Sequence, residues 1–274
     1  MDKEAPAEKT ISIVDDYPRH DFGDFFEIDQ VGIQMKKIMP GSFYKGKDDG
    51  HVNERPRHRV HMTRTFWCGL HPVTEAQYKE VVKKNPSMFK EIEESENLPV
   101  EKVSWDNAVS FCKKLTEIER EAGRLPEPYV YRLPTEAEWE YVCRAGSEED
   151  FVEDIETICW YFKNSNETAH PVGRKEPNNW GFYDMQGNIW EWVADGCDFQ
   201  ELEYFDKPGH QLVSNDVDDA INPVHFEGTN KIAKGGCWLM GPNSCTPSAR
   251  FLNPPDSKYF VLGFRIILAE PLVK

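Results

Sequence analysis

The sequence contains no uninterrupted run of about 18 apolar residues, so it offers no candidate for a membrane-spanning helix. Its first residues, Met-Asp-Lys-Glu-Ala-Pro-Ala-Glu, also lack the apolar core of a signal peptide. Such a start fits two origins: the linker left after an export or lipoprotein signal is removed, or a native cytoplasmic N-terminus. We expect the mature part of an exported cell-surface lipoprotein, with a cytoplasmic protein as the alternative.

Positive charge is scarce in this chain. There are 32 Lys and Arg residues against 48 Asp and Glu residues, which gives a net charge of −16 and a pI near 5.0. A surface of this sign repels the phosphates of nucleic acids and of anionic membranes. We therefore expect a monomer whose partner is a protein or another macromolecular ligand, and not a nucleic acid.

No two of the seven cysteines have the spacing of a Cys-x-x-Cys pair, and this absence excludes a zinc ribbon. Cys68, Cys112 and Cys143 lie in apolar or helical patterns. We expect these three thiols to be buried as small hydrophobic side chains.

Internal repeats and low-complexity linkers are also missing after residue 30, and an aromatic content of 12% is enough for a sizeable core. We therefore expect a single domain over residues 29–274. Residues 1–28 are acidic and contain proline, so we expect them to extend from the domain.

Three stretches carry the start signals of helices. Thr74 and Gln77, like Thr135 and Glu138, have the spacing of a capping box. Ser104 is expected to cap a further helix, because apolar residues recur after it at helical spacing. Short helices among many strands, without β-α-β alternation, predict an α+β fold with antiparallel strands and much irregular structure.

The C-terminal stretch 234–268 is the most informative part of the chain. It opens with a Gly-Gly turn and ends in the apolar run 263–268, which predicts a buried closing strand. The segment between them is rich in Pro, Asn and Ser, and its apolar residues follow no period. This composition favours a long ordered loop on a rigid scaffold, where binding residues gather. A final hairpin with a poorly structured connection explains the composition equally well.

The fixed points of this stretch are Gly235-Gly236-Cys237-Trp238, Cys245, Arg250, Pro255 and Gly263-Phe264-Arg265. This frame resembles the C-terminal signature of the formylglycine-generating (sulfatase-modifying factor) family, a variant of the C-type lectin fold. The earlier run Arg132-Leu133-Pro134-Thr135-Glu136-Ala137-Glu138-Trp139-Glu140 is similar to another motif of that family. The resemblance covers residues of about 30 to 268 and implies the family's fold for this chain.

Asp184, Asn188 and Glu191 supply hard oxygen ligands within one Gly-containing turn. Backbone carbonyls between them would complete the six to eight oxygens that Ca²⁺ takes. The resemblance implies a structural Ca²⁺ at the matching positions. The alternative is that these side chains cap turns through hydrogen bonds to the backbone.

The family's founding activity, oxidation of a sulfatase cysteine, resembles copper chemistry in which two cysteines hold Cu(I) as soft thiolates. Counted from the Gly-Gly pair, the first of these positions is Met240, and the loop that carries the second is shorter here. Cys245 matches a non-catalytic position counted back from Arg250, and Cys237 with Cys245 has the wrong spacing. We therefore expect no copper and assign no catalytic residue. The sequence also contains no recognisable motif for Ser-His-Asp or Cys-His chemistry.

The same frame resembles the variable proteins of diversity-generating retroelements, including a treponemal surface lipoprotein. That resemblance implies a non-catalytic ligand-binding protein that displays residues of about 237 to 262 as a variable loop surface. The alternatives are an oxidoreductase that modifies a sulfatase cysteine and a structural or accessory module. Trp238, Arg250 and Phe264 are expected to hold the fold. The candidate ligand-binding residues are Trp238, Leu239, Met240, Asn243, Ser244, Thr246, Ser248, Phe251, Leu252, Asn253, Ser257, Tyr259 and Phe260.

Overall fold

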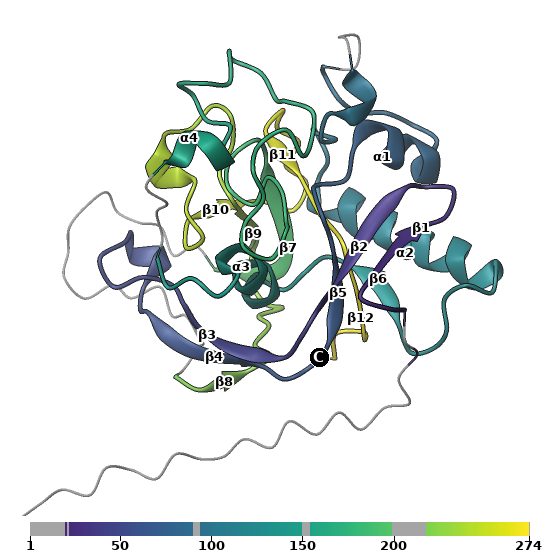
Figure 1. The fold of residues 1–274 in the computed structure, drawn as a ribbon, viewed down its shortest axis with the longest axis horizontal. Helices are drawn as coiled ribbons and strands as arrows, with labels where there is room; N and C mark the ends of the chain where they lie inside the picture. The colour runs from purple at the N-terminus through teal and green to yellow at the C-terminus, as the bar shows by residue number, and fades with distance from the viewer. Residues whose placement is uncertain (1–19, 21, 90–93, 150–153, 199–217, 274) are drawn as a thin grey trace, which may run out of the picture.

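The computed structural model describes residues 20, 22–89, 94–149, 154–198 and 218–273. Figure 1 shows three small sheets, with helices α1 and α2 on one side of the body and the three-stranded sheet on the other. Few helices, mixed sheets and long irregular connections confirm the predicted α+β class.

A five-stranded antiparallel sheet joins the beginning of the domain to its end. Its strands, in spatial order, are β1 (Phe25–Ile28), β2 (Ile33–Ile38), β5 (Phe66–Gly69), β12 (Ile267–Ala269) and β6 (Val130–Arg132). The folded domain therefore starts by Phe25, earlier than the expected boundary at residue 29, because β1 pairs with β2 along its whole length. Residues 1–19 of the expected extension lie outside the described residues.

Two smaller sheets complete the framework. The four-stranded sheet has the order β10 (Arg250–Asn253), β9 (Asn230–Lys234), β7 (Trp190–Cys197) and β11 (Leu262–Gly263), with β11 parallel to β7. The three-stranded sheet has the order β3 (Gly41–Lys45), β4 (His58–Met62) and β8 (Ala220–Ile221).

Three helices begin where their caps predict: α1 (Glu75–Val82), α2 (Trp105–Glu121) and α3 (Glu136–Arg144). The described residues also form the single turn α4 (Ile155–Ile158) and the 3-10 turns η1 (Val52–Glu54), η2 (Ser95–Asn97) and η3 (Pro242–Ser244). Thr74, Ser104 and Thr135 each accept a hydrogen bond from the backbone N–H three residues on, which confirms the predicted caps. Among the described residues, no helix is both long and apolar enough to cross a membrane.

The core has two main parts. One lies where α1 and α2 pack against the sheets, and it contains Phe111 and Phe264 with ring centroids 5.2 Å apart. The other surrounds α3 and contains Trp139. Cys68, Cys112 and Cys143 are all buried in these clusters, as their apolar surroundings predict.

The expected closing strand 263–268 is split into β11 and β12, which belong to different sheets. Arg265 lies at the break, fully buried, and its guanidinium makes two hydrogen bonds to Glu191 on β7. Arg265 Nε lies 2.6 Å from Glu191 Oε2, and Nη2 lies 2.7 Å from Oε1. The remaining donors of the guanidinium bind the carbonyls of Gly69, at 3.1 Å, and Tyr183, at 3.0 Å. The strand breaks here because this side chain must point inward, between the sheets.

Trp139 Nε1 also donates to Glu191 Oε2, at 2.8 Å, so α3 is bound to the same carboxylate. Burial alone would lower the pKa of Arg265, but the charge of Glu191 and its hydrogen bonds raise that pKa above the ordinary value. The guanidinium therefore stays charged inside the protein.

Arg265→Met should lower the free energy of unfolding by about 3–5 kcal/mol, because it leaves the Glu191 carboxylate buried without its counter-charge. Urea unfolding monitored by tryptophan fluorescence measures the change. Arg64→Met is the matched control: the side chain of Arg64 is 57% exposed where it pairs with Glu270, so its loss should cost at most about 1 kcal/mol. Equal losses for the two variants would contradict a special role for the buried pair.

Candidate functional site

The Gly-Gly turn that opens the C-terminal stretch requires glycine. Gly235 and Gly236 have φ values of +97° and +80°, which side chains rarely adopt. A Cβ on Gly236 would also come within 2.6 Å of Cys245 Sγ. From this turn the chain passes through η3 to β10, which pairs antiparallel with β9. The stretch is therefore an ordered loop, and its strand β10 forms a hairpin with β9, the strand that precedes the Gly-Gly turn.

Large apolar side chains of this loop face the solvent. Leu239, Tyr259 and Phe260 are 48%, 47% and 37% exposed. Phe260 packs on buried Trp238 with ring centroids 5.8 Å apart, and Tyr259 lies 6.5 Å from half-buried Phe251. Each exposed ring therefore packs on a less exposed one, which limits its freedom.

Phe162, which is not among the predicted ligand-binding residues, extends this group from another part of the chain. Its side chain is 52% exposed, its N–H donates to the carbonyl of Met240 at 3.1 Å, and its ring reaches Gly241. The only sequence signal is its place in the aromatic run Trp160-Tyr161-Phe162. We define the aromatic surface as Phe162, Leu239, Met240, Phe251, Tyr259 and Phe260.

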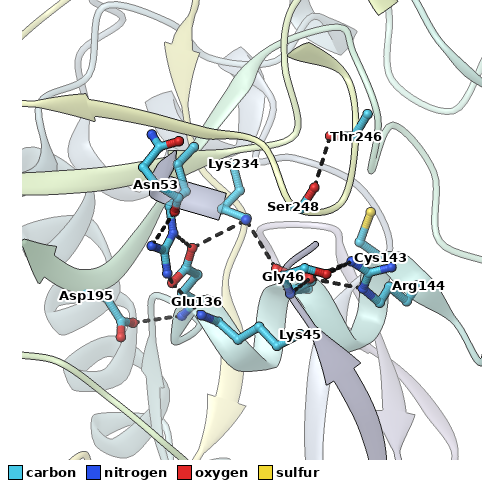
Figure 2. A network of polar contacts seen from close by, with 12 residues as sticks. Lys45, Gly46, Asn53, Glu136, Cys143, Arg144, Asp195, Lys234, Thr246 and Ser248 are labelled. Atoms are coloured by element: carbon cyan, nitrogen blue, oxygen red, sulfur yellow. Dashed lines mark hydrogen bonds and ion pairs between the residues drawn. The ribbon is translucent and has the colours of Figure 1, made fainter. Parts of the chain in front are cut away.

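Four of the candidate ligand-binding residues lie in the interior and do not belong to the exposed surface. Trp238, Thr246, Ser248 and Asn253 are all 5% exposed or less. The Thr246 and Ser248 hydroxyls lie 3.4 Å apart beneath the loop (Figure 2). Of these four, only Trp238 was expected at a buried position. Thr246, Ser248 and Asn253 are buried because the chain turns inward after η3. Asn243 is exposed, whereas Ser244, Leu252 and Ser257 are half-buried.

A network of buried charges lies under the loop (Figure 2). Lys45 Nζ lies 3.0 Å from Glu136 Oε2, and Lys234 Nζ lies 3.3 Å from both Glu136 and Glu140. Arg144 Nη2 lies 2.8 Å from Glu140 Oε1. These side chains come from β3, α3 and β9, so the network joins three separate elements.

Arg250 completes the network from β10. Its guanidinium makes two hydrogen bonds to the Glu136 carboxylate, and Nη1 donates to the carbonyl of Asn53 at 2.6 Å. Burial raises the pKa of Glu136, but Arg250, Lys45 and Lys234 together hold it well below the ordinary value. Arg250 thus neutralises an acidic group and holds the fold, as expected.

A family model described as the sulfatase-modifying factor enzyme 1-like domain matches residues 26–270. The chain belongs to this family. The formylglycine-generating enzyme of Mus musculus is 28% identical over 238 residues, which cover 79% of this chain and 55% of the mouse protein. The chain thus spans about half the length of the mouse enzyme. The chaperone protein LppX of Paenibacillus barcinonensis is 26% identical over 230 residues, covering 65% of this chain and 71% of that protein.

Solved structures in the same fold cover almost the whole domain. Treponema denticola variable protein 1 matches with a TM-score of 0.74 at 25% identity, over 90% of this chain and 98% of that chain. PvdO from Pseudomonas aeruginosa matches with a TM-score of 0.70 at 22% identity, over 89% and 97%. These matches confirm the formylglycine-generating-enzyme-type fold and the kinship with variable proteins.

The calcium site that this family resemblance implies was tested against the side chains present. Asp184 Oδ2 accepts from Gly173 N at 2.7 Å, and Asn188 bonds both the N–H and the carbonyl of His170 at 3.0 Å. Both oxygens of Glu191 bind Arg265. Among the described residues, no three His, Cys, Asp or Glu side chains converge as a metal site. Glu191 is therefore occupied by Arg265, and calcium binding by Asp184, Asn188 and Glu191 stays a prediction.

The copper site that the family resemblance implies needs two thiolates near Met240, and the side chains there do not supply them. Met240 is half-buried beside Phe162, whereas the thiols of Cys237 and Cys245 are fully buried. A hydrogen bond from Cys245 to Cys159, together with burial, raises the pKa of Cys159, and burial raises that of Cys237 to about 12. Neutral thiols are poor ligands for Cu(I), so these donors do not fit the metal.

One hydrogen-bonded Ser-His-Asp chain, which no sequence motif indicated, crosses the three-stranded sheet. Ser42 Oγ lies 2.7 Å from His61 Nδ1, and His61 Nε2 lies 3.0 Å from Asp219 Oδ1. Ser42 is the cross-strand neighbour of His61, and the Asp219 side chain is mostly exposed to water. We interpret these two hydrogen bonds as cross-strand contacts that stabilise the sheet edge, because cross-strand side-chain pairs are the ordinary unit of sheet stability.

Glu101 orders the edge of the aromatic surface. Its Oε1 accepts hydrogen bonds from the backbone N–H groups of Met88 and Phe89, and Phe89 packs edge-on against Trp238 with centroids 6.1 Å apart. Burial is the main reason that the pKa of Glu101 rises to about 7, and the charge of Glu75 adds to it. The two backbone hydrogen bonds lower that pKa only in part.

Glu101→Gln should remove a pH dependence of stability. The folded-state pKa, about 7, lies above the ordinary value of 4.5. The stability that Glu101 contributes is therefore fully present below pH 4.5 and is lost as the pH rises through 7. Glutamine keeps the acceptor oxygen and cannot ionise. As the pH rises, the free energy of unfolding of the variant should therefore increase relative to that of the native protein, by about 1.4 kcal/mol for each unit by which the pKa of Glu101 differs between the folded and unfolded states. Urea midpoints at pH 5 and pH 8 measure this gain, and parallel profiles would contradict it.

The calcium prediction is tested by thermal unfolding with and without a chelator. A Ca²⁺ that binds only the folded state adds about 2.7 kcal/mol at a hundredfold excess over its Kd, so chelation should lower the Tm. Asp184→Ala should abolish the difference between the two melts. Identical melts for the native protein would favour the turn-capping alternative, in which Asp184 and Asn188 serve only the backbone.

Proposed function

We propose that this chain is a non-catalytic ligand-binding protein whose aromatic surface recognises a macromolecular partner, most simply a protein at the cell surface. The observation that carries the proposal is the exposed group of large apolar side chains on an ordered loop. Exposed apolar groups of this kind are typical of interaction sites. Tyr and Phe are also enriched in the centres of protein interfaces.

The buried network under the loop supports the same function. Arg250 and Lys234 fix the two strands of the hairpin to Glu136, so the backbone beneath the aromatic surface is held independently of the exposed side chains. A rigid scaffold with large, stiff rings on top reduces the entropy lost on binding. The likeness to Treponema denticola variable protein 1 adds support, because it extends over nearly the full length of both chains.

The alternative is an oxidoreductase of the formylglycine-generating type, and the mouse enzyme supports it through sequence similarity. The thiols near the loop argue against it, since Met240 replaces one cysteine and Cys245 is buried against Cys159. The two functions are separated by incubating the protein with Cu(I) and a Cys-x-Pro-x-Arg peptide under oxygen. We expect no formylglycine by mass spectrometry, and peptide turnover with stoichiometric copper would overturn the binding proposal.

The binding proposal is tested with a phage-displayed peptide library selected against the immobilised protein. Peptides selected by the native protein should bind Tyr259→Ala and Phe260→Ala at least about tenfold more weakly, because large aromatic side chains dominate such interfaces. Phe25→Ala is the matched control, since Phe25 is 52% exposed on β1, in a different sheet. The proposal would be contradicted if the peptides also bound Phe25→Ala more weakly, or if they bound every variant as tightly as the native protein.

The same variants should separate binding from stability. Tyr259→Ala should change the free energy of unfolding by about 0.5 kcal/mol, as exposed positions do. Trp238→Ala should cost about 3–5 kcal/mol, because a buried aromatic side chain is removed. Chemical unfolding measures both values. A loss at Tyr259 as large as that at Trp238 would mean that the loop surface is part of the core.

A further inference from the structure

Two thiols from distant parts of the chain lie against each other beside the loop. Cys159 and Cys245 are both fully buried, and their side chains pack in the same small cluster. With Tyr161 they form a small apolar cluster, separate from the two main cores. By contrast, Cys68, Cys112 and Cys143 lie within the main cores.

Each of the two sulfur atoms occupies space that a glycine leaves open. A Cβ on Gly187 would lie 2.4 Å from Cys159 Sγ, and a Cβ on Gly236 would lie 2.6 Å from Cys245 Sγ. Both glycines have positive φ values, +81° and +80°, so the backbone there is suited to glycine alone. The backbone on both sides therefore leaves room for the two sulfur atoms.

The third nearby thiol has other neighbours. Cys237 belongs to the main core cluster that contains Trp190 and Trp238, and not to the cluster of Cys159 and Cys245. The Cys245 thiol approaches Cys237 only at its carbonyl oxygen, 3.9 Å away. The geometry thus favours Cys159 over Cys237 as the partner of Cys245.

We propose that Cys159 and Cys245 form a disulfide bond that fastens the loop carrying the aromatic surface to residues 159–165. The two thiols lose two protons and two electrons to a small-molecule disulfide such as oxidised glutathione, which is reduced to two thiols. The exchange passes through a mixed disulfide of one cysteine, which the second thiol resolves. The bond belongs to a protein that folds in an oxidising compartment.

The timing of the reaction follows from burial. Thiolate, and not thiol, attacks a disulfide, and the pKa of Cys159 is raised in the folded state. The oxidant also cannot reach either sulfur in the closed structure. The bond therefore forms while the chain folds, and once formed it is protected from reduction.

The disulfide would reinforce contacts that already join the two segments. Phe162 N donates to the carbonyl of Met240, and Ser165 Oγ donates to the carbonyl of Trp238 at 2.9 Å. A covalent link beside these hydrogen bonds restricts the loop before any partner arrives. The inference concerns only the chain itself, so it stands or falls separately from the proposed binding function.

The test refolds the full chain in glutathione buffer, then alkylates it in denaturant and measures its intact mass. Five of the seven cysteines should react, and non-reducing peptide mapping should show one cross-link, between the peptides that contain Cys159 and Cys245. Cys237→Ser should keep this cross-link, whereas Cys159→Ser should lose it. Alkylation of all seven cysteines, or a cross-link to Cys237, would overturn the proposal.

A second measurement needs no variant. Hydrogen exchange at the amides of residues 238–240 should be slower in the oxidised than in the reduced native protein, because the link holds this part of the loop closed. The amides of β2, far from the link, serve as the internal control. Equal exchange of residues 238–240 in the two states would refute the fastening role.

Discussion

The pairing of Arg265 with Glu191 is the interaction on which the arrangement of the sheets depends. Arg265 lies where the chain passes from the four-stranded to the five-stranded sheet, and Glu191 lies on the central strand β7. The same carboxylate binds the indole of Trp139, so α3 is fixed by it as well. Since a lone buried charge is very costly, the sheets and α3 must assemble together around this pair. The pair therefore specifies one arrangement among several that an apolar core would allow.

The loop above this framework combines two opposite environments. Its lower side is fixed by buried and partly buried charged side chains, since Lys234 and Arg250 both pair with Glu136. Its upper side carries Tyr259 and Phe260 in water. Exposed residues make few contacts that the fold requires, so their identity can change without loss of the backbone course. This separation of fold from surface is the physical basis for assigning the loop to recognition.

Much of the fold was predictable from the sequence, because its signals are local. Thr74 and Thr135 cap helices through bonds to residues three positions on, and the sequence shows both partners. The site was less predictable, because its contacts are distant. Glu191 looks like a metal ligand within its own turn, and only the fold shows that an arginine 74 positions away occupies it. The burial of Thr246 was likewise invisible, since the direction of the loop is set by the charge network.

The five-stranded sheet has a consequence for how the protein is made. Strand β12 lies between β5 and β6, so β6 cannot join the sheet until residues 267–269 have been synthesised. Until then β5 and β6 each keep an unpaired edge. Pairings between such distant residues are slow to form and leave the nascent chain open to aggregation. A cell that produces this protein therefore needs to shield β5 and β6 until β12 has been made.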